Sequence, residues 1–349
     1  MKYGLMYYKA TDNIGDDIQT YVAIKYLPKI DYYIDREALS CFVPDKKEYV
    51  SMIMNGWFIH NKLAWPPSPY INPLLISMHF KDSKETDVGD MYLKNFGGEV
   101  LKKYGPVGAR DTNSQARLQK NGIDAYFSGC MTLTLEKFPK IRKKKKICLV
   151  DVEDNIIEKV KKNTDQQLEI LTHFLDPNQT KKKSINERMK DVETLLKKYQ
   201  EAKLVITTRL HVALPCVALG TPVVLIHKEL FDNDRLGTFF YLMTNFQDKD
   251  FLQMDIRNLL INPPSNSRDY LKIKKNIDKK CKQFIKKCEN EFDVDKLPEI
   301  EKYKEYAEKL NWYKSIYECE RLIVEKIEHK RVQEFNLYHK NLDEIYKNL

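Results

Sequence analysis

The chain has 349 residues, of which 42% are hydrophobic and 31% are charged, and this length suits two α/β domains with an appended region. No apolar run approaches the about 18 residues of a membrane-spanning helix, and residues 1–8 lack the apolar core of a signal peptide, so we expect a cytoplasmic protein. The formal net charge of +9 comes without a helix-turn-helix, zinc-finger or RNP-type pattern, which argues against a nucleic-acid binder and favours solvated lysines or peripheral attraction to an anionic membrane surface.

The first part of the chain alternates strand and helix signals. Residues 1–8 predict a strand, a loop with the sequence NIGDD follows at 13–17, and residues 18–27 predict a helix. Further strands are predicted at 49–55, 74–79 and 103–107, and a helix is predicted at 112–121. This alternation is typical of a parallel sheet in a Rossmann-like domain, which we place at residues 1–140.

A basic run at 142–146 precedes a second set of elements, which predicts a second Rossmann-like domain at residues 141–265. Strands are predicted at 147–150, 168–173, 203–207 and 222–226, with helices at 184–199 and 212–219. Ser184 and Glu187 have the spacing of a capping box, in which each side chain binds an unpaired backbone N–H. Gly220 is placed to end the preceding helix.

Residues 266–349 predict a charged helical extension, because apolar residues recur there every three or four positions between dense charges. We expect this extension to pack on the body of the protein or on a second subunit, and a homo-oligomer is one expectation. The seven cysteines are scattered, odd in number and without a C-x-x-C pair. They predict free thiols, mostly buried, and no metal site.

Three loops at predicted strand ends carry groups suited to chemistry, because ligands of parallel sheets bind beyond the carboxyl ends of strands. Asn13, Gly15, Asp16 and Asp17 lie in the first loop, where they either hold sugar hydroxyls or cap the next helix. The second loop carries Arg110, whose planar fork matches a carboxylate or phosphate, beside Asp111, which either caps a helix or pairs with the arginine.

The third loop carries Arg209, Leu210 and His211 at the start of a helix, where backbone N–H groups favour an anion and a histidine can transfer a proton near neutral pH. Four more candidates for an acceptor site are predicted with less support. Asn55, Trp57 and His79 lie at strand ends, and Arg235 lies in a loop after the strand at 222–226.

Several segments together resemble the polysaccharide pyruvyl transferase family over about residues 1–240: DNIGDDIQ, MNGWF with WPPS downstream, ISMHF, GPVGARDTNS, AYFSGCMTLTL and LVITTRLHVALPCVALGTPVV. The resemblance implies a GT-B-like fold, with two Rossmann-like domains facing across a cleft. It also implies phosphoenolpyruvate as the donor, a sugar or oligosaccharide acceptor that is free or lipid-linked, and a pyruvyl ketal as the product. No cofactor is implied beyond phosphoenolpyruvate as co-substrate.

The resemblance places Arg209, Leu210 and His211 on the donor and Arg110 on the donor's anionic groups. The N-x-G-D element maps to Asn13, Gly15 and Asp16 with a less definite role. On this basis we expect His211 to act as an acid, the two arginines to stabilise charge, and Asp16 to be a candidate base for the sugar hydroxyl. Two rival interpretations remain: a GT-B glycosyltransferase that uses a nucleotide sugar, and a non-catalytic scaffold that uses its helical tail for assembly.

Overall fold

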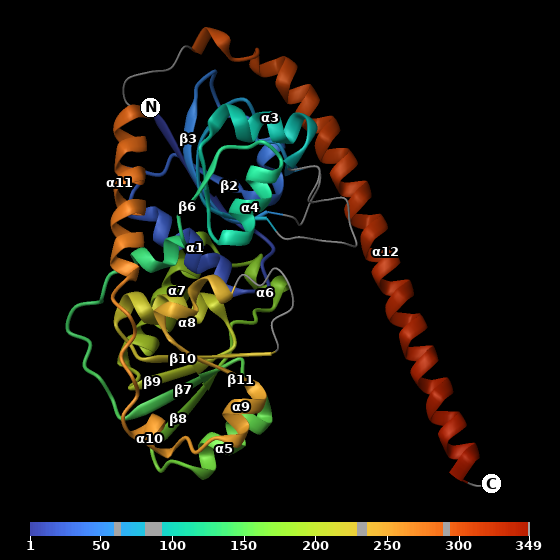
Figure 1. Ribbon diagram of the computed structural model, residues 1–349. Coiled ribbons are helices and arrows are strands. Elements are labelled where there is room, and N and C mark those ends of the chain that lie inside the picture. Colours follow the sequence, from blue (N-terminus) through green and yellow to red (C-terminus); the bar gives the residue numbers. More distant parts are fainter. Residues whose placement is uncertain (59–63, 81–92, 229–235, 289–293, 348–349) are drawn as a thin grey trace.

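The protein is built on two parallel β-sheets, one above the other in Figure 1, with helices between them. The computed structural model describes residues 1–58, 64–80, 93–228, 236–288 and 294–347. The predicted fold class, two Rossmann-like α/β domains in a GT-B-like arrangement with a helical C-terminal region, is confirmed.

The first sheet has the strand order β2-β1-β3-β4-β5-β6, and every pair in it is parallel. Its strands are β1 (Lys2–Tyr7), β2 (Tyr32–Asp35), β3 (Val50–Trp57), β4 (Ile71–His79), β5 (Val107–Ala109) and β6 (Ala125–Phe127). The central strand β3 is buried along nearly its whole length, which explains why its sequence is mostly apolar and does not alternate with exposed polar residues.

The second sheet has the order β11-β10-β9-β7-β8 and is also parallel in every pair. Its strands are β7 (Lys146–Val150), β8 (Gln167–Leu171), β9 (Leu204–Thr207), β10 (Val223–His227) and β11 (Thr244–Gln247). The strands predicted in this half correspond to β7, β8, β9 and β10. The short strands β2, β6 and β11 were not predicted. The strand predicted at 103–107 is wrong in its bounds, because the chain is helical up to Tyr104 and β5 begins at Val107.

Helices connect the strands and cover the sheets. In the first domain they are α1 (Ile14–Ile24), η1 (Arg36–Cys41), α3 (Asn95–Tyr104), α4 (Thr112–Lys120) and the 3-10 helix η3 (Met131–Thr134). Those that follow are α5 (Asp154–Lys162), α6 (Pro177–Thr180), α7 (Ile185–Glu201), α8 (Leu210–Leu219), η4 (Gly237–Leu242), α9 (Asp248–Gln253), α10 (Arg257–Ile261), α11 (Tyr270–Cys288), η5 (Val294–Lys296) and α12 (Ile300–Lys347).

Two local predictions in the second domain are confirmed. Ser184 and Glu187 form a reciprocal capping box at the start of α7. Gly220 ends α8 with a φ of 68°, a left-handed conformation that glycine adopts without steric cost. The turn therefore lets the chain pass from α8 directly into β10.

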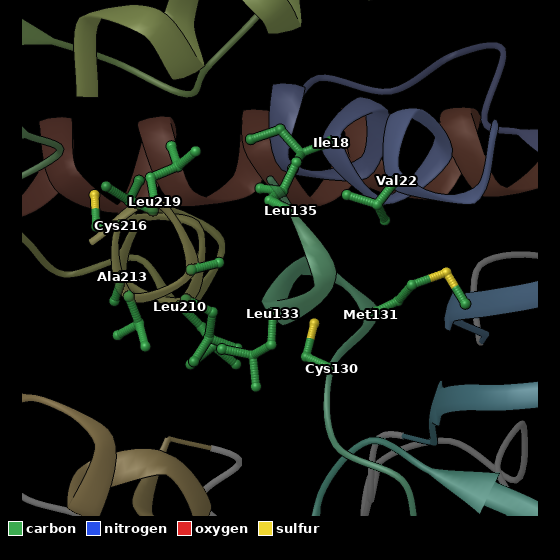
Figure 2. Close-up of a cluster of buried hydrophobic side chains, with 14 of the residues drawn as sticks. Ile18, Val22, Cys130, Met131, Leu133, Leu135, Leu210, Ala213, Cys216 and Leu219 are labelled. Carbon is green, nitrogen blue, oxygen red and sulfur yellow. The ribbon is translucent and has the colours of Figure 1, made fainter. Parts of the chain in front are cut away.

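The junction of the two domains is filled by one apolar core. Figure 2 shows α1, η3 and α8 converging there, with Leu133 on η3 beside Leu210 on α8 and Leu135 beside Ile18 on α1. Because these side chains come from both halves of the chain, apolar burial holds the carboxyl ends of the two sheets close together.

The two C-terminal helices behave differently. α11 packs Ile273, Ile277 and Cys281 into the junction core, so it is part of the body. The first turns of α12 are anchored where the hydroxyl of Tyr303 donates to the Ser40 carbonyl at 2.8 Å. Figure 1 shows the rest of α12 running away from the body. Within the described part of the chain, no helix is long and apolar enough to cross a membrane.

Candidate active site where the two sheets meet

Each sheet has one topological switch point, at which the connections from neighbouring strands run to opposite sides of the sheet. We call this place the direction-change position. In the first sheet, β1 continues to β2 on one side and β3 lies on the other; in the second sheet, β7 has the same relation to β8 and β9. The loops that follow these neighbouring strands run apart and leave a crevice, which is where ligands of open parallel sheets bind. Both of these positions carry charged residues here.

At the second sheet's position, Arg209 follows β9 and Asp151 follows β7. The Nε of Arg209 donates to Asp151 Oδ2 at 3.1 Å, and the guanidinium lies over the Phe174 ring, 4.3 Å from its centroid. The side chain is 31% exposed, and among the described residues no protein hydrogen bond engages its Nη1 or Nη2. The loop thus holds the guanidinium in place through Nε and leaves the edge formed by Nη1 and Nη2 for a ligand.

Asp151 organises this loop. It has a φ of 49°, and its carboxylate also accepts from the Thr172 hydroxyl at 2.7 Å and the His173 backbone N–H at 3.1 Å. The buried His173 side chain bonds to the Tyr199 hydroxyl at 2.8 Å. Burial lowers the pKa of His173 to about 4, with a smaller opposing effect from Asp151, so this ring is neutral at physiological pH.

His211 lies in the first turn of α8 and packs against the first loop of the other domain. A Cβ on Gly15 would be 3.0 Å from His211 Cβ and 3.1 Å from its Nδ1. Only glycine gives the histidine this room. The same loop is joined to the second domain by the Ile14 N–H, which donates to the His173 carbonyl at 2.9 Å. The predicted N-x-G-D loop and the predicted histidine are therefore in contact.

Arg110 follows β5 and is 1% exposed. Its Nε is 3.7 Å from Asp111 Oδ2, yet within the described residues none of its three guanidinium nitrogens has a hydrogen-bond partner. Burial would raise the pKa of Asp111, but the hydrogen bond from His79 at 2.6 Å, with further help from Arg110, lowers it to about 2. The Asp111 carboxylate thus accepts its short hydrogen bond from His79, and it forms no hydrogen bond with Arg110.

The surroundings of Arg110 connect it to α8. Burial raises the pKa of the Cys130 thiol, and Arg110 is the largest influence that lowers it. Cys130 directly precedes η3 and lies close to Leu133 and Leu210 in Figure 2. Arg110 therefore lies within electrostatic reach of Cys130, which belongs to the apolar core at the junction.

The three helices that begin in the predicted loops differ in how their N-termini are capped. Asn13 caps α1 by accepting from the Gly15 N–H, and Asp111 caps α4 by accepting from the Ser114 N–H. The N-cap of α8 is Arg209, which makes no side-chain hydrogen bond to its own helix. An arginine cannot accept such a bond, so the first N–H groups of α8 suit an anion.

The other predicted site residues have varied surroundings. Asp16 accepts from the Arg36 guanidinium at 3.3 Å, and Asn55 donates to the Gln19 carbonyl at 3.0 Å. Asp17 is buried in an ion pair with Arg188 of α7. Trp57 ends β3 and is partly buried. Arg235 lies outside the described residues.

Three residues of this region were not predicted from the sequence: Asp151, His173 and Arg36. Asp151 directly follows a predicted strand, so the rule that picked out Arg110 and Arg209 would also have found it. Arg36 follows β2, a strand of four residues that is partly exposed and gave no clear signal. In the part of the chain that the structure describes, no group of His, Cys, Asp and Glu side chains is arranged to hold a metal ion.

A sequence model of the family described as polysaccharide pyruvyl transferase matches residues 13–226. A search of curated proteins found no match. Among solved structures, a UDP-GlcNAc 2-epimerase from Methanocaldococcus jannaschii is 10% identical, covering 83% of this chain and 100% of its own with a TM-score of 0.44. The heptosyltransferase WaaC from E. coli is 12% identical, covering 81% and 100% with a TM-score of 0.29.

Proposed function

Because the chain belongs to the polysaccharide pyruvyl transferase family, we propose that it moves the pyruvyl group of phosphoenolpyruvate onto sugar hydroxyls, forms a pyruvyl ketal and releases phosphate. Phosphoenolpyruvate carries a carboxylate and a phosphate on a three-carbon frame. A site for it must present several donors of hydrogen bonds within a few ångströms, on more than one side.

The observation that carries this proposal is the state of Arg110. A guanidinium that is 1% exposed and has three nitrogens without a hydrogen-bond partner among the described residues is costly, since each unsatisfied buried polar group costs about 1–3 kcal/mol. Such a group persists where a ligand satisfies it during function. A bidentate carboxylate or phosphate is the ligand whose shape matches the fork.

The second domain supplies the complementary half of the donor site. The free edge of Arg209 and the N–H groups at the start of α8 present positive potential to one region. We assign one anionic group of the donor to Arg110 and the other to Arg209 with the α8 N-terminus. This arrangement would bring the vinyl carbon of the donor next to His211.

The proposed reaction balances with two protons from the acceptor. A proton delivered by His211 adds to the methylene carbon of the donor and makes C2 electrophilic, and one sugar hydroxyl oxygen then bonds to C2. The C2–O bond to phosphate breaks, and a second hydroxyl oxygen closes the ketal. One hydroxyl proton replaces the proton that His211 gave, and the other leaves with phosphate. The arginines stabilise the charge that collects on the departing phosphate.

In the arrangement described here, Arg110 is too enclosed to touch a ligand, so we propose that the donor enters through a local movement of the segments around Thr112 and Thr238, while the apolar core of the junction stays packed. Two residues after Arg110, the hydroxyls of Thr112 and Thr238 share a hydrogen bond at 3.0 Å. This bond joins α4 to η4 at an exposed position and is weak enough to break during each cycle.

The direct test is phosphate release from phosphoenolpyruvate in the presence of a panel of sugar and oligosaccharide acceptors, run beside a panel of nucleotide sugars. We expect phosphate release that depends on an acceptor, and its loss in His211→Asn and Arg209→Ala. Arg257→Lys, a change in an exposed ion pair with Asp255, serves as the matched control and keeps activity. Turnover of a nucleotide sugar, or full activity of the two site variants, would overturn the proposal.

A further inference from the structure

A small hollow lies at the direction-change position of the first sheet, among residues that follow β1, β2 and β3. Its lining includes Tyr8 after β1, Arg36 after β2 and Asn55 near the end of β3, together with Asp16 and Gln19 on α1. This is the place at which an open parallel sheet binds a ligand, and the donor site proposed above leaves it unused.

Arg36 is the central group of the hollow. It is 4% exposed, with its guanidinium over the Tyr8 ring, 4.2 Å from the centroid. Its Nη1 donates to Asp16 at 3.3 Å and its Nε donates to Glu37 at 3.2 Å. Its Nη2 has no hydrogen-bond partner among the described residues. A buried guanidinium that lines a hollow with one nitrogen unsatisfied has room for one more acceptor.

The charges around the hollow exclude an anionic ligand. Burial lowers the pKa of Arg36, but the neighbouring carboxylates of Asp16 and Glu37 outweigh this effect and raise it, so the guanidinium stays charged. Two carboxylates, those of Asp16 and Glu37, face this one cation, and their combined charge more than balances it. A phosphate or carboxylate entering here would meet Asp16, which is itself only 14% exposed, at close range and would be repelled.

The ligand must therefore accept from Arg36 and donate to Asp16, and a hydroxyl group is the simplest group that does both. We propose that this hollow binds one hydroxyl of the acceptor sugar, held between the Arg36 guanidinium and the Asp16 carboxylate. Gly56 lies beside Arg36, and its φ of 129° is one that other residues rarely adopt, so the backbone turn next to the hollow depends on glycine.

The hollow lies next to the loop against which His211 packs. Asp16 directly follows Gly15, and Gly15 is the residue on which His211 packs. A sugar anchored at Asp16 therefore extends toward the donor site from the first domain. This inference rests on the proposed function for the reaction, but not for the binding of a hydroxyl.

The test combines protein variants with acceptors that lack single hydroxyls. Methyl glycosides of common hexoses and their monodeoxy derivatives are assayed by phosphate release from phosphoenolpyruvate, with the wild type, Arg36→Lys and Asp16→Asn. Because a hydrogen bond to a charged group contributes about 1.5–3 kcal/mol, we expect each variant to raise the acceptor KM about 10- to 100-fold and to leave the KM for phosphoenolpyruvate unchanged.

The deoxy analogues identify the hydroxyl. One monodeoxy glycoside should be a poor acceptor for the wild type, and Arg36→Lys should not discriminate further against it. Asp12→Asn, an exposed carboxylate in the same loop, and Arg257→Lys are the matched controls and should behave as wild type. Equal penalties for every deoxy analogue in wild type and variants, or an effect on the KM for phosphoenolpyruvate alone, would overturn the inference.

Failure of the proposed function would look different, because the wild type would then release no phosphate with any acceptor. Binding of the same glycosides is in that case followed by saturation-transfer NMR. Loss of the glycoside signal in Arg36→Lys and Asp16→Asn, both checked for a wild-type circular dichroism spectrum, supports the hydroxyl site. An unchanged signal in both variants refutes it.

Discussion

Two buried arginines of this protein should respond in opposite ways to replacement by methionine. Arg110 is 1% exposed, and its three guanidinium nitrogens have no hydrogen-bond partner among the described residues. Arg188 is 4% exposed, but its Nε donates to Asp17 at 3.0 Å and its Nη2 donates to the Tyr8 carbonyl at 2.7 Å. The first arginine is kept at a cost to stability, whereas the second holds the two domains together.

The size of each effect follows from these contacts. Arg110→Met removes a charged group with unsatisfied donors and leaves Asp111 bonded to His79, so we expect the ligand-free protein to gain about 1–3 kcal/mol. Arg188→Met leaves the Asp17 carboxylate buried without its partner and should cost about 3–5 kcal/mol. Each kcal/mol corresponds to roughly 2 °C in Tm for a chain of this size.

The assay is thermal unfolding with and without phosphoenolpyruvate, together with phosphate release. The wild type should be stabilised by phosphoenolpyruvate, and Arg110→Met should not respond to it. Loss of two hydrogen bonds to charged groups, each about 1.5–3 kcal/mol, should lower kcat/KM at least about 100-fold. If Arg110→Met unfolds below the wild type without ligand, the guanidinium is a structural group and the reasoning about the donor site is wrong.

Three further results are expected. Gly15→Ala places a methyl group 3.0 Å from His211 Cβ, so it should lower kcat about 100-fold by displacing the histidine while the circular dichroism spectrum stays that of the wild type; unchanged kcat would show that the contact is unimportant. Burial lowers the pKa of His173 from 6.5 to about 4. Between pH 6.5 and pH 4 the unfolded state therefore binds a proton that the folded state does not, so the free energy of unfolding should decrease by up to about 1.4 kcal/mol per pH unit as the pH falls. Urea unfolding at pH 4.5 and 7.5 should show a smaller difference for His173→Gln than for the wild type, and an equal difference would count against a buried neutral ring. Truncation after Leu310 should leave Tm and turnover unchanged. Truncation before Ile300 removes the contacts of Tyr303 with Ser40 and Tyr70 and should lower Tm. Sedimentation velocity on both truncated proteins shows whether α12 carries self-association.

The sequence was most informative where a buried strand runs directly into a helix. The unit β9–α8–β10 was predicted nearly to the residue, because an apolar strand, a polar turn, an apolar helix and Gly220 follow one another without insertion. The same continuity identified Arg209 and Arg110. Strand β2 has only four residues and an exposed face, so its sequence does not stand out from the flanking loops. Arg36, which follows β2, was therefore not identified as a candidate.

Partners across the junction could not be predicted for a different reason. The pairing of Asp17 with Arg188 spans 171 residues of sequence, and the contact of Gly15 with His211 spans a similar stretch. Composition and periodicity describe one element at a time, so they hold no information on which loop meets which. Asp17 was accordingly predicted to hold sugar hydroxyls, and the structure places it in an interdomain ion pair.

The two direction-change positions explain why the proposed reaction needs both domains. Arg209 and Asp151 occupy one position, and Arg36 and Asp16 occupy the other, with Gly15 and His211 in contact between them. Under the proposed function, the second position selects an anion, because Arg209 keeps a free edge and α8 lacks a side-chain cap. The first selects a hydroxyl, because two carboxylates already more than balance the charge of Arg36. Two sites of opposite preference that meet at one imidazole would bind the donor and the acceptor each in its own place, and so would hold the sugar hydroxyl next to the reacting carbon.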